Sequence, residues 1–375
     1  KQIMEKIIII GAGISGLFLA NLLEKNGKYN YKILEKKNNV NLYDGYGLQI
    51  SVNGIKLLNH IGFKEIKIHD INYPKNINFY QAKSCKLITK ISISKFNDKD
   101  NYYTTLKRST LINFLLKNIP KEKILYNAKV TDTKESDPFK IYLNRANVLD
   151  ANYIAICDGV FSGSKSRFLK NESKVEYNES LALRGTIKNL TDRDISVYLG
   201  PNFHFVIYPV NQNNEANFIS IIREKNLSKF QKTEKSGLVK DFIDLISRKT
   251  TYNLKNTIEN VSLYPVYVSR KFVKPENKKV FLTGDALFAY PPSFAQGASQ
   301  SIESSYEVFK SITEGRDDYY QKRALITNKV NFRSKINQFA FHASNPVTIF
   351  ARNLAIKYLS KNDFFLANYL GKIYK

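Results

Sequence analysis

The first clear pattern of hydrophobic and polar positions lies near the amino end of the chain. Ile7–Ile10 form an unbroken apolar run, which is typical of a buried parallel strand. The next residues show helical spacing, with Leu17, Ala20 and Leu23 on one side, and Gly27 is suited to end that helix. Tyr31–Leu34 then predict a second strand. The pattern therefore indicates a strand–helix–strand unit.

Further along the chain, segments with the same mixture of predicted helices and strands alternate with a region rich in predicted strands. Residues 108–116 predict a helix, and residues 124–126 and 151–157 predict strands. Between residues 181 and 223, four short segments rich in β-branched and aromatic residues are separated by Asn, Asp and Gly, which favours an antiparallel sheet. A helix over 238–247, a strand leading to Gly284, and long helical stretches follow. We find no internal repeat.

These segments predict an α/β protein with a Rossmann-like domain, an inserted antiparallel sheet and a helical C-terminus. We expect the Rossmann-like domain to comprise residues 1–72, 101–180 and 276–345. The β-rich domain would comprise residues 73–100 and 181–275, and a helical segment would follow over residues 346–375. The length of 375 residues and the hydrophobic content of 43% suit two closely joined domains.

Composition excludes some classes of protein and leaves others open. The net charge of +25 invites a nucleic-acid partner, but the lysines are scattered along the whole chain, so we do not expect one. The charge could still attract an acidic substrate or a membrane surface at its periphery. No apolar stretch is long enough to cross a membrane, and no leader is visible. Cys85 and Cys157 lack metal or redox spacing, so we expect a reduced, cytoplasmic protein without a metal site.

A glycine motif follows the first predicted strand. Gly11, Gly13 and Gly16 have the spacing GxGxxG, which permits a tight turn, close approach of a pyrophosphate, and tight helix packing. Glu35 lies nineteen positions after Gly16, at the end of the next strand, where a carboxylate can bind an adenosine ribose. The motif therefore predicts a dinucleotide site.

A second helix start with similar properties lies far along the chain, in Thr283-Gly-Asp-Ala and Pro-Pro-Ser-Phe-Ala-Gln-Gly-Ala. Asp285 can accept hydrogen bonds from hydroxyl groups, and Pro292 can shape the edge of a ring system. Backbone N–H groups near Gly297 and Ala298 can stabilise negative charge. Two helix N-termini at opposite ends of the chain suggest one large cofactor bound by both.

Together with Asp158-Gly159, which also follows a predicted strand, these motifs resemble those of the FAD-dependent aromatic hydroxylases. These are the group A flavoprotein monooxygenases with the para-hydroxybenzoate hydroxylase fold, and the salicylate hydroxylase-like branch is most similar. Two departures are visible. Phe288 stands where the family has His, and two extra residues lie between Ser162 and Arg167, so either Ser162 or Ser164 matches the family's serine. The resemblance implies FAD contacts at Gly11, Gly13, Ser15, Gly16, Glu35, Lys36, Arg108, Val130, Asp158, Asp285, Pro292, Gly297 and Ala298.

The resemblance also implies the reaction. Such enzymes use NADH or NADPH as a transient reductant and O2 as co-substrate, and a flavin C4a-hydroperoxide hydroxylates a small aromatic or heteroaromatic substrate. His204 and Tyr208 lie four apart on a predicted strand and thus on one face, where a base could deprotonate a phenol. Arg184 could pair with a substrate carboxylate. His342 lies where the branch often has a cavity histidine.

Other functions remain open at this stage. A ring hydroxylase of the ubiquinone pathway, acting on a polyprenylphenol, would share the fold but need an apolar tunnel and membrane attachment. A flavin halogenase is disfavoured because the chain has no Trp. A non-catalytic flavoprotein or a nucleic-acid binder is the alternative outside enzymes. No second GxGxxG is visible for a nicotinamide, so the choice between NADH and NADPH stays open, as does that between monomer and homodimer.

Overall fold

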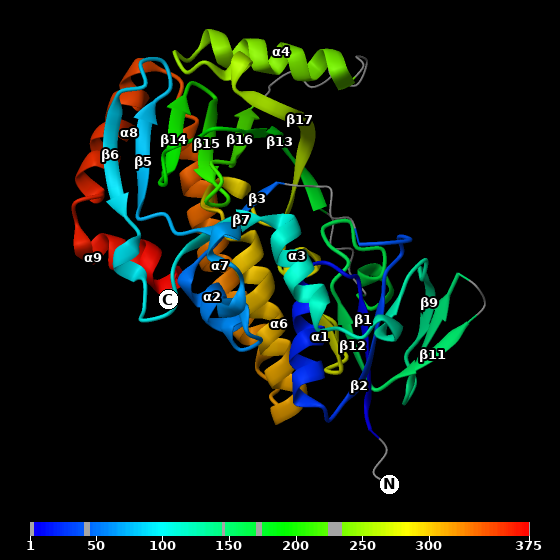
Figure 1. The fold of residues 1–375 in the computed structure, drawn as a ribbon. Helices are drawn as coiled ribbons and strands as arrows, with labels where there is room; N and C mark the ends of the chain where they lie inside the picture. The colour runs from blue at the N-terminus through cyan, green and yellow to red at the C-terminus, as the bar shows by residue number, and fades with distance from the viewer. Residues whose placement is uncertain (1–3, 41–45, 145–146, 170–174, 224–234, 375) are drawn as a thin grey trace.

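The computed structural model describes residues 4–40, 46–144, 147–169, 175–223 and 235–374. A parallel sheet forms the lower half of the molecule in Figure 1. Its strand order is β18, β12, β1, β2, β8, and the neighbours pair in parallel. The strands are β1 (Lys6–Ile10), β2 (Asn30–Leu34), β8 (Ile124–Leu125), β12 (Tyr153–Ile156) and β18 (Val280–Leu282).

Helices α1 (Ile14–Asn26), α3 (Arg108–Lys117) and α6 (Gly297–Glu314) pack beside this sheet, with α1 between the other two. The first strand–helix–strand unit is therefore confirmed, and Gly27 ends α1 in the left-handed conformation that its position predicted. Ile7, Ile9, Leu17 and Leu23 are fully buried, which explains the apolar runs. A small antiparallel sheet, which the sequence patterns did not reveal, covers one side: β9 (Val130–Lys134), β10 (Phe139–Leu143) and β11 (Val148–Ala151).

A seven-stranded sheet forms the upper half, in the order β17, β13, β16, β15, β14, β5, β6. Its strands are β5 (Asn76–Gln81), β6 (Leu87–Ser92), β13 (Val175–Ile187), β14 (Ile195–Gly200), β15 (Phe203–Pro209), β16 (Ala216–Arg223) and β17 (Ile258–Ser269). The predicted inserted sheet is confirmed. It is not wholly antiparallel, however, because β14 pairs with β5 in parallel. Helix α4 (Lys235–Arg248) covers its outer face, where Phe242 and Ile246 pack against the sheet.

Shorter elements join the two halves. A three-stranded sheet consists of β3 (Gly47–Ile50), β7 (Thr104–Lys107) and β4 (Ile71–Asn72), and helix α2 (Val52–Asn59) packs against α6. The chain passes from β18 through α5 (Gly284–Leu287) and the single turn η8 (Pro292–Phe294) into α6.

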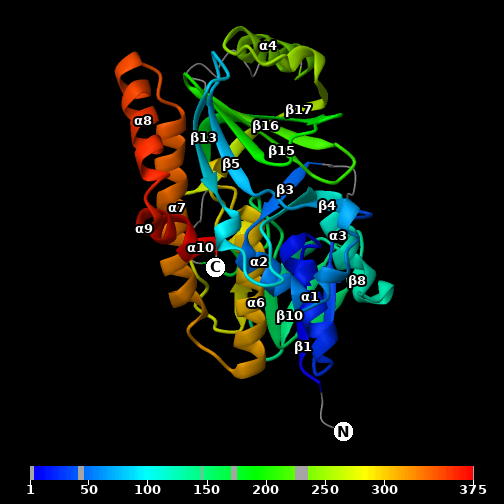
Figure 2. The ribbon, with the colours of Figure 1, turned by 60° about the vertical axis from the view of Figure 1, so that its left-hand side comes forward.

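The C-terminal helices stand along one edge of the molecule in Figure 2. They are α7 (Tyr319–Phe341), α8 (Pro346–Leu359), α9 (Asp363–Leu366), a π-helical turn over Ala367–Gly371, and α10 (Lys372–Tyr374). Their inner sides lie against the seven-stranded sheet, where Phe341, Leu366 and Tyr374 join a buried cluster with strand residues such as Phe79. The domain boundaries given above stay predictions.

Candidate flavin and substrate site

Three loops meet at one edge of the parallel sheet, because each follows the carboxyl end of a parallel strand. They follow β1, β12 and β18 and carry the three motifs found in the sequence. Gly11 has a φ of 107°, and a Cβ atom there would lie 2.6 Å from the carbonyl oxygen of Cys157. Gly284 has a φ of 56°, and its Cβ atom would lie 2.2 Å from Oγ of Ser15. The amino-terminal and distal motifs are thus in direct contact, as the idea of one shared cofactor requires.

The first loop is braced by Glu35. Its Oε2 accepts a hydrogen bond from the backbone N–H of Ala12 at 3.0 Å, and its Oε1 accepts one from Lys37 at 2.9 Å. The carboxylate is only partly buried and lies beside the glycine turn, where a ribose could displace or share these contacts. Lys36 is exposed just beyond it, and Val130 is buried at the start of β9.

The second loop leaves part of one carboxylate without a partner. Oδ2 of Asp158 accepts a hydrogen bond from the backbone N–H of Ser164, and Oγ of Ser162 accepts one from Lys165. Both candidate serines therefore belong to this loop. Oδ1 of Asp158 is buried and has no hydrogen-bond partner among the described residues. A buried carboxylate oxygen without a partner is costly, so it is suited to a hydroxyl or N–H group of a ligand.

The third loop begins a cavity of about 650 Å³. Asp285, Pro292, Gly297 and Ala298 line one end of it. Asp285 borders the open space of the cavity, and the protein packed around its carboxylate raises the pKa to about 6 by desolvation, against the opposing charge of Arg184. A Cβ atom at Gly297 would meet nothing within 4 Å, so the start of α6 leaves room for a ligand.

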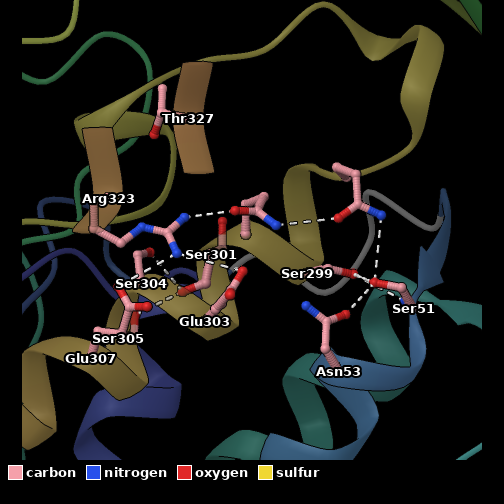
Figure 3. Close-up of polar contacts among 12 residues, drawn as sticks. Ser51, Asn53, Ser299, Ser301, Glu303, Ser304, Ser305, Glu307, Arg323 and Thr327 are labelled. Carbon is pink, nitrogen blue, oxygen red and sulfur yellow. Dashed lines mark hydrogen bonds and ion pairs between the residues drawn. The ribbon is translucent and has the colours of Figure 1, made fainter. Parts of the chain in front are cut away.

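A chain of polar side chains behind this end holds the start of α6 (Figure 3). Arg323 is buried, lies 3.5 Å from a carboxylate oxygen of both Glu303 and Glu307, and donates a hydrogen bond of 2.6 Å to Gln300. Gln300 contacts Gln296, whose amide group reaches Ser51. Since Gln296 lines the cavity, the buried arginine fixes a residue of the site through two amides.

Strand β15 lines the other end of the cavity. His204 and Tyr208 both line it, as their spacing on one face predicted, and both are buried. Nδ1 of His204 lies 2.9 Å from Nε2 of His342, so a hydrogen bond joins the two rings. Burial lowers the pKa of His204 well below its usual range, with His342 as the second cause. Burial, and then Arg223, lowers the pKa of His342 to about 4, so both rings are neutral at pH 7.

Arg184 also lines the cavity, on the side of Asp285. Its guanidinium carbon lies 5.2 Å from the centre of the Tyr46 ring, and its charge opposes the rise that burial causes in the pKa of Tyr208. The arginine therefore lies at the junction of the two ends of the cavity rather than deep in the substrate end.

The sequence patterns did not single out Arg352. It is the one buried residue of α8, lines the cavity, and burial lowers its pKa to about 10. Two of its nitrogens donate to Oδ1 of Asn353, but Nη1 is buried without a hydrogen-bond partner among the described residues. No local signal distinguishes it in the sequence, because α8 also carries Asn353 and Lys357.

Comparison with known proteins agrees with this geometry. Residues 4–317 match the model of the family described as FAD binding domain, and the chain belongs to that family. It therefore binds FAD, as the motifs predicted, and the three loops above are suited to hold it. Asp158, Asp285, Glu35 and the start of α6 supply the donors and acceptors that such a group requires.

Curated relatives give the class of enzyme. The chain is 26% identical over 192 residues to the FAD-dependent monooxygenase dpchE of Colletotrichum higginsianum, a match that covers 48% of this chain and 39% of the relative. It is 20% identical over 363 residues to the 3-hydroxybenzoate 6-hydroxylase of Polaromonas naphthalenivorans, covering 90% of this chain and 88% of the relative. The chain is thus of the flavin-dependent monooxygenase type.

Solved structures share the fold. HpxO of Klebsiella pneumoniae, in complex with FAD and uric acid, matches with a TM-score of 0.80 at 16% identity, over 94% of this chain and 93% of that one. A salicylate hydroxylase in complex with its substrate matches with a TM-score of 0.73 at 16% identity, over 100% and 99%. The predicted fold of the aromatic hydroxylases is therefore confirmed.

Proposed function

We propose that the protein is an NAD(P)H- and O2-dependent FAD monooxygenase that hydroxylates a small aromatic or heteroaromatic substrate resembling a phenolic acid. One observation carries this proposal. A single cavity joins the residues that would surround the flavin ring, such as Asp285 and Pro292, to the residues that would contact a substrate, such as His204 and Tyr208. Bound FAD, once reduced, supplies activated oxygen from O2, and the protein has to place the substrate ring beside it.

The substrate end suits a phenol. A neutral His204 can accept a hydrogen bond from a phenolic hydroxyl, which makes the substrate ring richer in electrons at the carbon that is hydroxylated. His342 holds the ring of His204 by the hydrogen bond between them and so sets which nitrogen faces the cavity. Apolar side chains of the sheet and of α8, among them Val206, Ile219 and Ile356, line the space around it and exclude water.

Two cations favour an acidic substrate. Arg184 and Arg352 line the cavity at different places, and Arg352 has no carboxylate that shifts its pKa. A buried, unpaired guanidinium is costly, and a substrate carboxylate would remove much of that cost. 3-Hydroxybenzoate 6-hydroxylase, a relative, is named for an acid of this kind.

A second candidate substrate class has support from one observation. The cavity continues between the C-terminal helices, where Leu359, Phe365 and Leu370 line it. An apolar extension of this kind would accept the chain of a polyprenylphenol, as a hydroxylase of the ubiquinone pathway needs.

The test is a substrate panel on the purified yellow protein. NADH and NADPH consumption and O2 uptake would be measured with salicylate, hydroxybenzoates, urate, kynurenine and short polyprenylphenols, and products would be checked for one oxygen atom from labelled O2. We expect one phenolic acid to stimulate consumption at least about tenfold and to gain the label. Stimulation by polyprenylphenols alone would support the second class. Bound FAD with no stimulation and no labelled product for any compound would contradict both.

A further inference from the structure

The C-terminal helix α8 is apolar on two opposite sides. Its inner side carries Ile356 and Leu359 into the cavity. Its outer side exposes Val347, Phe350, Leu354 and Tyr358, which lie three or four residues apart and thus form one stripe. Phe350 is 70% exposed and Tyr358 is 72% exposed. A helix that is apolar on two opposite sides is expected to be covered on both, but within the described residues nothing covers this outer stripe.

Helix α7 and the start of α9 extend the same kind of surface. Leu325, Phe332 and Phe339 are exposed at intervals of seven residues, and Phe339 is 77% exposed. Phe364 is exposed at the start of α9. We call the eight residues of these three helices the outer C-terminal face: Leu325, Phe332, Phe339, Val347, Phe350, Leu354, Tyr358 and Phe364. The helices that carry them form the edge of the molecule in Figure 2. Single exposed apolar residues are common, but a set of this size, with five aromatic rings, marks a contact surface.

Residues 319–362, which carry all of this face except Phe364, have charge of one sign, and Asp363 beside Phe364 forms an ion pair with Lys95. Residues 319–362 contain no Asp or Glu, and their basic residues are Lys322, Arg323, Lys329, Arg333, Lys335, Arg352, Lys357 and Lys361. Arg323 is buried with two carboxylates from α6, but Lys329, Lys335, Lys357 and Lys361 are exposed. Lys361 follows the end of α8. At roughly 100° per residue, the other three lysines lie within about 80° of the middle of the apolar stripe on their helix. They therefore flank the stripe and do not occupy the opposite side.

From this arrangement we infer that the outer C-terminal face docks the enzyme on the surface of an anionic phospholipid bilayer. Apolar and aromatic side chains would enter the boundary between headgroups and acyl chains, and the flanking lysines would reach lipid phosphates. The surplus of 25 positive charges would attract the whole molecule to such a surface. The described helices include none that could span a bilayer, so the contact is confined to its surface.

A second copy of the chain is the competing occupant, and charge disfavours it. In a two-fold dimer the same face meets itself. The lysines of residues 319–362 would then face lysines of the other copy, with no carboxylate from that segment to neutralise them. Phosphate groups of lipids provide the complementary charge that a second copy of this face lacks.

The experiment is flotation of the full-length, FAD-bound protein with vesicles of phosphatidylcholine alone or with phosphatidylglycerol added. We expect binding to the anionic vesicles, at least about tenfold weaker binding to neutral ones, and loss of binding in high salt. The variant Phe339→Ser/Phe350→Ser/Leu354→Ser should bind at least about tenfold more weakly. The variant Lys329→Gln/Lys335→Gln/Lys357→Gln/Lys361→Gln should lose the preference for anionic vesicles.

Controls separate docking from damage to the fold. None of the seven substituted residues lines the cavity, so both variants should keep their FAD and their unfolding temperature. Ile68→Ser removes an apolar side chain that is 58% exposed on a different element, and it should bind vesicles as the unchanged protein does. Failure of the unchanged protein to float with anionic vesicles would overturn the inference, as would equal loss in the Ile68 variant. A stable dimer that the apolar variant dissociates, without any vesicle binding, would assign the face to self-association instead.

Discussion

The contact between Ser15 and Gly284 joins two loops that lie far apart in the sequence, and substitutions at both positions can measure it as a coupling energy. Alanine at position 284 would have to adopt a φ of 56°, which costs about 1 to 2 kcal/mol for a residue with a Cβ atom. That atom would also lie 2.2 Å from Oγ of Ser15, so the hydroxyl must move, at a further cost of about 1 to 2 kcal/mol. We therefore expect Gly284→Ala to lower the free energy of unfolding by about 2 to 4 kcal/mol.

Removing the hydroxyl should relieve part of this cost. With Ser15→Ala, the nearest remaining atoms lie 3.0 Å away, at Oγ of Ser301, and 3.4 Å away, at Cβ of Ser15. The double variant should then be less destabilised than the two single variants predict, with a coupling energy of about 1 kcal/mol or more. FAD affinity should fall at least about tenfold in Gly284→Ala and recover in part in the double variant, because both loops shape the cofactor site.

The assay is urea unfolding of the four proteins without flavin, followed by FAD titration monitored by flavin fluorescence. Gly27→Ala is a matched control: its φ is 69°, but a Cβ atom there meets nothing within 4 Å. It should cost only the conformational strain and show no coupling to Ser15→Ala. If positions 15 and 284 are as additive as positions 15 and 27, the two loops do not touch and the argument for a joint cofactor site fails.

Four further outcomes are expected. Asp285→Ala should release FAD and bleach the purified protein, and retained yellow colour would contradict a role in binding the ribityl chain. His204→Gln should keep its colour but slow substrate oxidation by about 100-fold or more, or release the consumed O2 as hydrogen peroxide in place of hydroxylated product. Unchanged steady-state kinetics would remove this residue from the mechanism. The pKa of His342 is lowered to about 4, so between pH 6.5 and 4 the folded state binds fewer protons than the unfolded state. The free energy of unfolding should therefore fall by about 3 kcal/mol as the pH falls from about 6.5 to about 4. Urea unfolding of His342→Gln should show a flatter pH profile. Arg352→Gln should raise KM for an acidic substrate at least about tenfold while a neutral phenol analogue is unaffected, and equal effects on both would indicate a structural role.

The elements around the cofactor could be predicted because local signals specify them. Ile7–Ile10, Gly27 and the glycines at 11, 13 and 16 act within a few residues of themselves, and the structure confirms the elements that they predicted. The shared face of His204 and Tyr208 follows in the same way from the alternation of a strand.

Features that depend on distant partners could not be predicted. The parallel pairing of β14 with β5 joins segments more than a hundred residues apart, and no local pattern specifies it. The hydrogen bond between His204 and His342 depends on how the end of α7 meets β15. Arg352 looks like any helical arginine until the fold places its helix over an apolar cavity, so its burial without a carboxylate could be seen only in the structure.

The central position of β1 also bears on how the protein is made. The two strands on one side of β1 in the parallel sheet are β12, from residues 153–156, and β18, from residues 280–282. A ribosome must therefore synthesise the chain as far as Leu282 before the parallel sheet that contains β1 is complete. The nascent protein would expose the unfinished edge of that sheet to chaperones until then. FAD could therefore be bound only late in synthesis, and a product truncated before Val280 would lack β18 and the loop of Asp285 that follows it.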